Sequence, residues 1–291
     1  MRLEWLAIPL LACLLSPLGG CARAVEANEG RIVHREKSMY RDLMVVETEQ
    51  HRCMSFARRG GMQSCMFKHA PDMLAIPYTR GAFAGLLANP GARRVLVIGL
   101  GGGVIPRAMR RIDPSIRIDV VELDPAVVEV AKQYFGYRED PLLRTRIGDG
   151  RVFVRRQARA GVRYDLIVID AYERVYVPEH LMSREFIGEV KSLLAPDGVV
   201  ASNTFARGPL APYETATYQS VFGETRIVAD GKPPRQPTAM FFAHEGFAVR
   251  LREPRGIDAD FLQPDFGGAV VLLEHGDPEL RRWNAQRAGD E

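Results

Sequence analysis

The sequence lacks the features that mark a multispanning membrane protein, a repeat protein or a nucleic-acid-binding protein. Its apolar run at residues 6–15 is too short to cross a bilayer, and it contains no repeats or low-complexity tracts. Neither sign of charge dominates: the formal net charge is +3 over 291 residues, too mild to indicate a nucleic-acid partner. Hydrophobic residues make up 46% of the chain, enough for a core of enzyme size.

Cysteine is also scarce, and two of the four cysteines lie within the first 21 residues. The other two, Cys53 and Cys65, are twelve residues apart. In an oxidising compartment they could form a disulfide worth about 3 kcal/mol, and the alternative is two free thiols on opposite faces of a hairpin. With only His51 and His69 nearby, these cysteines do not have a familiar metal-ligand spacing, so we predict no metal site.

The first twenty residues have the pattern of a bacterial signal peptide. An early arginine, Arg2, precedes the apolar run, and Leu18-Gly19-Gly20-Cys21 resembles a lipobox. This pattern predicts lipidation of Cys21 and a protein on the periplasmic face of a bacterial membrane, touching the membrane only through its lipid. The alternatives are an ordinary cleaved signal peptide, or a misassigned start codon and a cytoplasmic protein.

Residues 30–70 alternate between apolar and polar side chains, which favours strands over helices. The runs at 31–34, 43–47 and 53–56 carry this alternation, and residues 59–63 indicate a turn. We therefore expect a small antiparallel sheet before the main domain.

The strongest pattern in the chain is an apolar, β-branched run at residues 93–98 that changes abruptly to glycine. It predicts a buried parallel strand whose end lets a ligand approach the backbone closely. The alternative is a turn that only packs a helix tightly on the sheet. The glycines are Gly99, Gly101, Gly102 and Gly103.

An acidic residue follows the next predicted strand. Residues 116–121 form an apolar β-branched run that ends at Glu122. A carboxylate at this position accepts hydrogen bonds from the two hydroxyls of a ribose in nucleoside-binding βαβ units. The sequence thus predicts a nucleoside site.

Helical and strand patterns continue to alternate through the rest of the main domain. Asp124-Pro125 and Ser183 are helix starts, and a helical stripe after Ser183 runs to Leu193 and Leu194. Parallel strands place their carboxyl ends at one sheet edge, so Gly101, Glu122, Asp149 and Asp170 should converge there. Further strands are expected at 144–147, 164–170, 198–205, 226–228, 239–243, 247–249 and 269–273.

The predicted fold class is α/β, with a Rossmann-like parallel sheet. A helix is expected at residues 73–88, where the main domain begins. The predicted division is a signal peptide at 1–20, a β region at 21–72, a nucleoside-binding domain at 73–275 and a charged tail at 276–291.

These motifs, in this order, resemble the spermidine synthase (polyamine aminopropyltransferase) family over residues 31–205. The resemblance implies a methyltransferase-type sheet that binds decarboxylated S-adenosylmethionine. It also implies that the glycine turn and Gly150 contact this donor, Glu122 holds its ribose, and Asp149 holds its adenine amino group. Family members are commonly dimers or tetramers, so a homo-oligomer is possible.

The resemblance places Asp170 beside the amine that reacts, with Glu173 as a second carboxylate. A carboxylate at a strand end can position an amine and take its proton. The sulfonium of the donor is already a good leaving group, so the transfer needs no metal. The alternative for Asp170 is a structural acid that caps the next helix.

The chain departs from the family pattern where the acceptor would bind. Typical members have Asp-Ser-Ser-Asp-Pro after the fourth strand, and this chain has Asp-Ala-Tyr-Glu-Arg from Asp170, which puts Tyr172 in the loop. Two further substrate pairs fall on Tyr40-Arg41 and on Tyr78 with Arg80. A guanidinium repels a polyamine and attracts a carboxylate. Arg80 could therefore bind the carboxylate of ordinary S-adenosylmethionine, or both arginines could belong to an ion network with Glu47 or Glu173.

Three functional hypotheses follow. The first is aminopropyl transfer from decarboxylated S-adenosylmethionine to a small amine such as putrescine. The second is another transfer, such as methyl transfer, from S-adenosylmethionine. The third is a lipoprotein that binds a nucleoside or polyamine without turnover.

Overall fold

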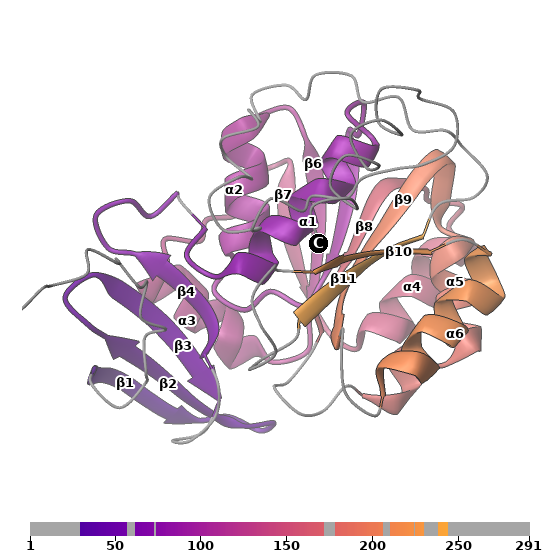
Figure 1. Cartoon of the computed structure of the whole chain (residues 1–291). Coiled ribbons are helices and arrows are strands. Elements are labelled where there is room, and N and C mark those ends of the chain that lie inside the picture. Colours follow the sequence, from indigo (N-terminus) through magenta and orange to yellow (C-terminus); the bar gives the residue numbers. More distant parts are fainter. Residues whose placement is uncertain are drawn as a thin grey trace, which may run out of the picture.

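The computed structural model describes residues 30–56, 62–72, 74–171, 178–205, 210–223, 225–229 and 238–243. It shows a small sheet beside a larger sheet that is covered by helices (Figure 1). The predicted signal peptide with Cys21, the predicted strands at 247–249 and 269–273, and the tail lie outside the described residues. No helix in the described ranges is long and apolar enough to cross a membrane.

The small sheet is an antiparallel meander, as the alternation predicted. The turn prediction for 59–63 was wrong at its end, because the last strand already begins at Met62. Cross-strand packing explains this: Ser64, Cys65 and Met66 are buried against the preceding strand. The strands are β1 (Arg31–Lys37), β2 (Asp42–Glu47), β3 (His51–Phe56) and β4 (Met62–Phe67).

Cys53 and Cys65 form a disulfide between β3 and β4. The two residues are directly opposite each other in the strand register, and their Cα atoms are 4.1 Å apart. Both cysteines are buried. The structure thus decides between the two alternatives that the spacing left open.

The large sheet has the order β10-β11-β9-β8-β5-β6-β7 in the described residues. Strands β5 to β9 run parallel, and β10 and β11 add an antiparallel edge, so the prediction of a Rossmann-like α/β fold is confirmed. The strands are β5 (Arg94–Ile98), β6 (Arg117–Glu122), β7 (Leu143–Ile147), β8 (Tyr164–Ile169), β9 (Leu194–Phe205), β10 (Thr225–Ala229) and β11 (Thr238–Ala243).

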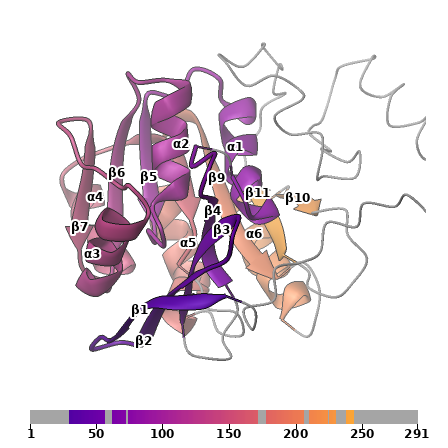
Figure 2. The ribbon, with the colours of Figure 1, turned by 90° about the vertical axis from the view of Figure 1, so that its left-hand side faces the viewer.

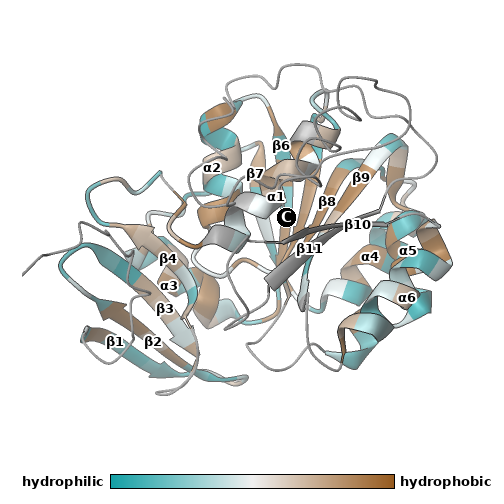
Figure 3. Ribbon diagram, viewed as in Figure 1, coloured by the Kyte–Doolittle hydropathy of each residue, from teal (hydrophilic) through white to brown (hydrophobic). Residues whose placement is uncertain are grey.

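Helices cover both faces of this sheet. Figure 2 looks onto the sheet, with its strands spread from β7 on the left to β10 on the right. One face carries α1, α2 and α3, and the other carries α4, α5 and α6. The brown, apolar colour of the central strands in Figure 3 fits burial from both sides. The helices are α1 (Pro77–Ala88), α2 (Val104–Ile112), α3 (Pro125–Tyr134), α4 (Gly150–Arg159), η1 (Glu179–Leu181), α5 (Arg184–Lys191) and α6 (Ala211–Phe222).

Two predicted boundaries were wrong. The helix expected at 73–88 begins at Pro77, because proline disfavours helical backbone in the residue before it and fits the first helical position. Leu194 was expected on a helix, yet it begins β9, since α5 ends at Lys191 and Leu194 pairs with Tyr164 of β8.

Candidate active site

The glycine turn after β5 is built so tightly that side chains cannot fit. Gly99 has φ +95°, and a Cβ there would lie 2.3 Å from the carbonyl oxygen of Asp170. Gly103 has φ +69°, and its Cβ would lie 2.5 Å from the ring of Tyr137. Gly101 and Gly102 face Ser64 of β4, so the small sheet forms one side of this turn. The glycines therefore also serve packing, as the alternative interpretation held.

Glu122 is the last residue of β6, and its side chain binds the backbone on both sides of the site: in the glycine turn and at Asp124. One carboxylate oxygen accepts a hydrogen bond from the Leu100 amide at 2.8 Å, and the other accepts one from the Asp124 amide at 3.0 Å. The side chain is 8% exposed, and this burial raises the pKa of the Glu122 carboxyl group. Each oxygen keeps a further lone pair that could meet a ribose hydroxyl.

Arg41 belongs to an ion network behind Glu122. Its guanidinium is 3.9 Å from the Asp124 carboxylate and lies over the ring of Phe56 at 4.3 Å. The hydroxyl of Ser38 also donates to Asp124, at 2.5 Å. The neighbouring Tyr40 is 47% exposed. Arg41 therefore forms an ion pair with Asp124, a carboxylate that neither interpretation of the sequence named.

Asp149 follows β7 and caps α4. One carboxylate oxygen accepts a hydrogen bond from the Val152 amide at 2.9 Å, and the other is 2.8 Å from Nε2 of His180 in η1. Gly150 lets the helix start close to the sheet, since a Cβ there would lie 2.7 Å from the side chain of Ile98. His180 was not among the predicted site residues, because no local pattern links η1 to the end of β7.

Asp170 directly follows β8, and its amide donates to the carbonyl oxygen of Ile98 at 2.7 Å. Its carboxylate accepts a hydrogen bond from the side-chain amide of Asn203, at the end of β9, at 2.8 Å. The pKa of Asp170 is raised to about 7, mainly because the surrounding protein desolvates the group. The charge of Glu122 contributes to the rise, while the hydrogen bond from Asn203 and the interaction with the Tyr78 hydroxyl oppose it.

Tyr78 connects Asp170 to the small sheet. Its hydroxyl donates to the carbonyl oxygen of Gln63 in β4 at 2.7 Å, and the same group interacts with the Asp170 carboxyl group. Burial and the nearby Asp170 raise the pKa of Tyr78 well above its usual value. Asn203 belongs to no motif, so it was not predicted as a site residue. Its signal in the sequence was the change from apolar to polar side chains at the end of the predicted strand.

The sheet edge therefore carries three carboxyl groups in distinct settings: Glu122, Asp149 and Asp170. The pKa of Asp170 is shifted to about 7, which suits a group that accepts a proton. Arg80 lies in α1, but its side chain is outside the described structure, as are Tyr172 and Glu173. Among the described residues, no cluster of three or more His, Cys, Asp or Glu side chains is arranged to hold a metal.

A Rossmann-like α/β sheet with carboxyl groups at the ends of its parallel strands is typical of S-adenosylmethionine-dependent transferases. The family model of the spermine/spermidine synthase domain matches residues 82–220. The chain is also 41% identical to the polyamine aminopropyltransferase of Vibrio vulnificus, over 75% of this chain and 72% of that protein. The chain therefore belongs to the polyamine aminopropyltransferase (spermidine synthase) family, and the resemblance seen in its motifs is confirmed.

Two solved structures support the same fold. A probable spermidine synthase from Corynebacterium glutamicum superposes with a TM-score of 0.64 at 21% identity, covering 75% of this chain and 82% of that one. The human methyltransferase-like protein 13, solved with SAH, gives a TM-score of 0.56 at 25% identity, covering 70% and 99% of the two chains.

Proposed function

We propose that this protein transfers an aminopropyl group from decarboxylated S-adenosylmethionine to a small amine such as putrescine. The observation that carries the proposal is the Asp170 carboxyl group, which stands beside the glycine turn with a pKa of about 7. The relative in Vibrio vulnificus bears the name of this activity.

Asp170 acts as the base in this proposal. The lone pair of the acceptor amine attacks the methylene carbon next to the sulfonium, the carbon–sulfur bond breaks, and methylthioadenosine leaves. The amine gives up one proton, which Asp170 accepts. The hydrogen bond from Asn203 orients the carboxylate, and Tyr78 supplies a second contact.

The remaining strand-end acids hold the donor. Glu122, fixed by two backbone amides, accepts hydrogen bonds from the ribose. Asp149 accepts one from the adenine amino group through a lone pair left free by Val152 and His180. The glycine turn lets the donor lie against the backbone of residues 99–103.

The first test is calorimetry on protein lacking residues 1–21. It is titrated separately with decarboxylated S-adenosylmethionine, S-adenosylmethionine, methylthioadenosine and spermidine. Tighter binding of the decarboxylated donor than of S-adenosylmethionine, followed by turnover with putrescine, is the expected result. Binding of polyamine alone, or of nothing, contradicts the proposal and favours a lipoprotein without turnover.

A second candidate is methyl transfer from S-adenosylmethionine. Arg80 in the sequence favours it, because a guanidinium suits the carboxylate that the decarboxylated donor lacks. The fold shared with the human methyltransferase-like protein 13 is compatible with it. A preference for the carboxylated donor in the same titration decides for this candidate.

We also propose that Cys21 is lipidated and that the protein is tethered on the periplasmic face of a bacterial membrane. The lipobox-like Leu-Gly-Gly-Cys pattern supports this, and the Cys53–Cys65 disulfide is compatible with an oxidising compartment. The mass of the protein purified from membranes tests it: the expected mass is that of a chain starting at Cys21 plus acyl groups. A chain that keeps residues 1–20 in the soluble fraction contradicts it.

A further inference from the structure

Strand β7 lies at one edge of the large sheet as described and carries two exposed arginines, Arg144 and Arg146. They pair in register with Asp119 and Val121 of β6. Paired residues of neighbouring strands point to the same face of a sheet, and Val121 packs in one cluster with Val154 of α4. Arg144 and Arg146 therefore lie on the face that α4 covers.

Helix α4 adds two more exposed arginines beside this edge. Val152, Arg156 and Arg159 are spaced by four and three residues, so they form one exposed stripe along the helix. Arg156 lies on the opposite side of the helix from Arg151, which binds Glu189 of α5. Since α4 packs on β6 and α5 packs on β9, the side that carries Arg156 is the side nearer β7.

A fifth arginine comes from β6. Arg117 is exposed and lies two residues before Asp119, so it points to the same face of the sheet. These five residues make up the arginine face: Arg117, Arg144, Arg146, Arg156 and Arg159. Within the described part of the chain, none of them forms an ion pair or a hydrogen bond. The neighbouring carboxylate of Asp119 is already bound by Arg94 and by the hydroxyl of Tyr164.

Other arginines of the described structure are neutralised by nearby carboxylates. Arg93 pairs with Asp113 at 2.8 Å, and Arg110 pairs with Asp140 at 2.8 Å. The formal net charge of the whole chain is only +3, so five unpaired positive charges on one face make the electric field of the protein one-sided. The sequence did not reveal this, because a sum of charges does not show where they gather.

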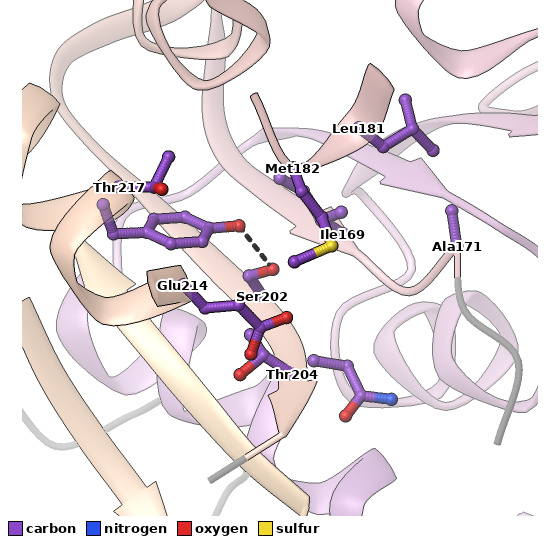
Figure 4. Close-up of a pocket in the computed structure, with 10 residues that line it drawn as sticks. Ile169, Ala171, Leu181, Met182, Ser202, Thr204, Glu214 and Thr217 are labelled. Atoms are coloured by element: carbon purple, nitrogen blue, oxygen red, sulfur yellow. Dashed lines mark hydrogen bonds between the residues drawn. The ribbon is translucent and has the colours of Figure 1, made fainter. Parts of the chain in front are cut away.

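The arginine face suits a broad anionic surface better than a small anion or a nucleic-acid strand. It shares no residue with the hollow between β8, β9 and α6 in Figure 4, whose ten lining residues include no arginine. Proteins that bind single strands also offer aromatic side chains on which bases stack. The exposed tyrosines of the described residues, Tyr40 and Tyr213, lie outside β6, β7 and α4.

We propose that the arginine face docks on an anionic phospholipid bilayer. Guanidinium groups bind phosphate in a bidentate manner, and each basic residue near such a surface adds to the attraction. The proposed lipid attachment at Cys21 favours this partner, because β1 begins only ten residues further on, at Arg31, a reach of about 35 Å at most. Such a tether keeps the bilayer at high effective concentration for the arginine face.

Sedimentation with sucrose-loaded vesicles tests this inference on protein lacking residues 1–21, so that no lipid anchor contributes. All described contacts lie in residues 30–243, and the removal takes none of them away. The wild type should bind vesicles of phosphatidylglycerol and phosphatidylcholine in equal parts about 10-fold or more tightly than vesicles of phosphatidylcholine alone. Raising NaCl from about 50 mM to about 500 mM should release it, because salt screens the attraction.

Arg144→Gln/Arg146→Gln should weaken binding to the anionic vesicles about 10-fold or more, since two guanidinium groups are lost from the face. Arg35→Gln/Lys37→Gln is the matched control, because it removes two exposed cations at alternate positions of another edge strand, β1. The control should change the affinity less than about threefold. Both variants should keep the wild-type melting temperature, since the four side chains have no partners in the described structure.

A second variant tests whether α4 belongs to the same face. Arg156→Gln/Arg159→Gln should also weaken binding to the anionic vesicles about 10-fold or more. Wild-type affinity in this variant would show that α4 does not meet the bilayer and would overturn the arginine face as a unit.

Three further results would overturn the inference. Equal losses in the β7 variant and in the β1 control would show that only net charge matters. Equal binding to both kinds of vesicle would exclude recognition of anionic lipid. Tighter binding of a single-stranded oligonucleotide, lost in Arg144→Gln/Arg146→Gln, would assign the face to nucleic acid instead.

Turnover of putrescine, measured in parallel, separates this inference from the proposed function. The arginine face includes none of the strand-end acids, so Arg144→Gln/Arg146→Gln should keep kcat/KM within about twofold of the wild type. Absence of turnover in every protein would contradict the proposed transfer and leave the vesicle result as it stands.

Discussion

Asp170 gains its chemistry from its neighbours rather than from its residue type. An aspartate carboxyl group in water has a pKa of 3.8, whereas the pKa of Asp170 is about 7, mainly because the group is desolvated. The carboxylate form of Asp170 can therefore accept a proton near neutral pH. Asn203 limits the shift, because its hydrogen bond favours the ionised form.

The rate of aminopropyl transfer should follow the ionisation of Asp170. We expect kcat/KM to increase with pH through an apparent pKa of about 7. Asp170→Asn should lower kcat about 10²- to 10⁴-fold while the affinity for the donor is kept, because the amide cannot accept the proton. Stopped assays across pH 5–9 and donor calorimetry check both. Equal rates for the variant and the wild type would refute the role of Asp170.

The same group makes the folded protein less stable at high pH. The pKa of Asp170 is about 7 in the fold and 3.8 ordinarily, so between these values the folded state holds a proton that the unfolded state has lost. The contribution of Asp170 to the free energy of unfolding is therefore most favourable below about pH 4 and is lost as the pH rises through 7. Asp170→Asn should therefore raise the melting temperature relative to wild type by about 2–8 °C at pH 8 and less at pH 5. A difference independent of pH would contradict this.

Glu122 serves both the nucleoside and the glycine turn. Glu122→Ala should abolish nucleoside binding and also lower the free energy of unfolding by about 2 kcal/mol or more, because the amides of Leu100 and Asp124 lose their acceptor. Calorimetry with methylthioadenosine and denaturant titration measure the two effects. The exposed Glu129→Ala on α3 is the control. Unchanged affinity would remove Glu122 from the site.

At the scale of elements, the small sheet is part of the active site rather than an appendage. Strand β4 places Ser64 against Gly101 and Gly102, and the carbonyl oxygen of Gln63 accepts the Tyr78 hydroxyl. The disulfide joins the next residue of this strand, Cys65, to β3. The bond thus fixes the strand that lines the glycine turn.

Removing the disulfide should loosen this strand pair. The double variant Cys53→Ser/Cys65→Ser should have a free energy of unfolding lower by about 3 kcal/mol, as expected for a closed loop of this length. Denaturant titration with and without reductant checks it, since reductant should destabilise the wild type and leave the variant unchanged. Alkylation of two thiols in untreated protein from its native compartment would speak against the bond.

At the scale of the whole molecule, the two sheets share one core. Leu43, Val45 and Met54 of the small sheet belong to the same buried cluster as Val95 of β5 and Leu166 of β8. Polar contacts also join the two sheets: the hydroxyl of Ser38, beside the small sheet, donates a hydrogen bond to Asp124, which follows β6 of the large sheet. A core that crosses between sheets favours unfolding as one unit.

We expect a single unfolding transition for both sheets. Backbone amides of β3 and β8 should exchange hydrogen with equal free energies when exchange is global, because neither sheet keeps a complete core without the other. Native-state exchange followed by mass spectrometry at increasing denaturant measures this. Earlier exchange of the whole small sheet would show that it unfolds independently.

Local patterns in the sequence were enough for the elements and for the edge where the site lies. The run at 93–98 with its glycines, the acid at Glu122 and the strand-end Asp149 and Asp170 could be located because parallel strands always present their carboxyl ends at one edge. The antiparallel small sheet followed from alternation alone. Boundaries at Met62 and Leu194 were missed, because pairing with other strands decided them. The helix start at Pro77 was missed although it follows from the local backbone preference of proline.

Only the tertiary structure decided what surrounds each acid. The pairing of Cys53 with Cys65, the approach of Asn203 to Asp170 and of His180 to Asp149, and the ion network of Arg41 join residues from different elements. No local pattern encodes such contacts, because they depend on how separate strands and helices pack. The pKa of Asp170 arises from that packing, so the sequence determined the fold and its ligand edge, and the tertiary structure determined the chemistry there.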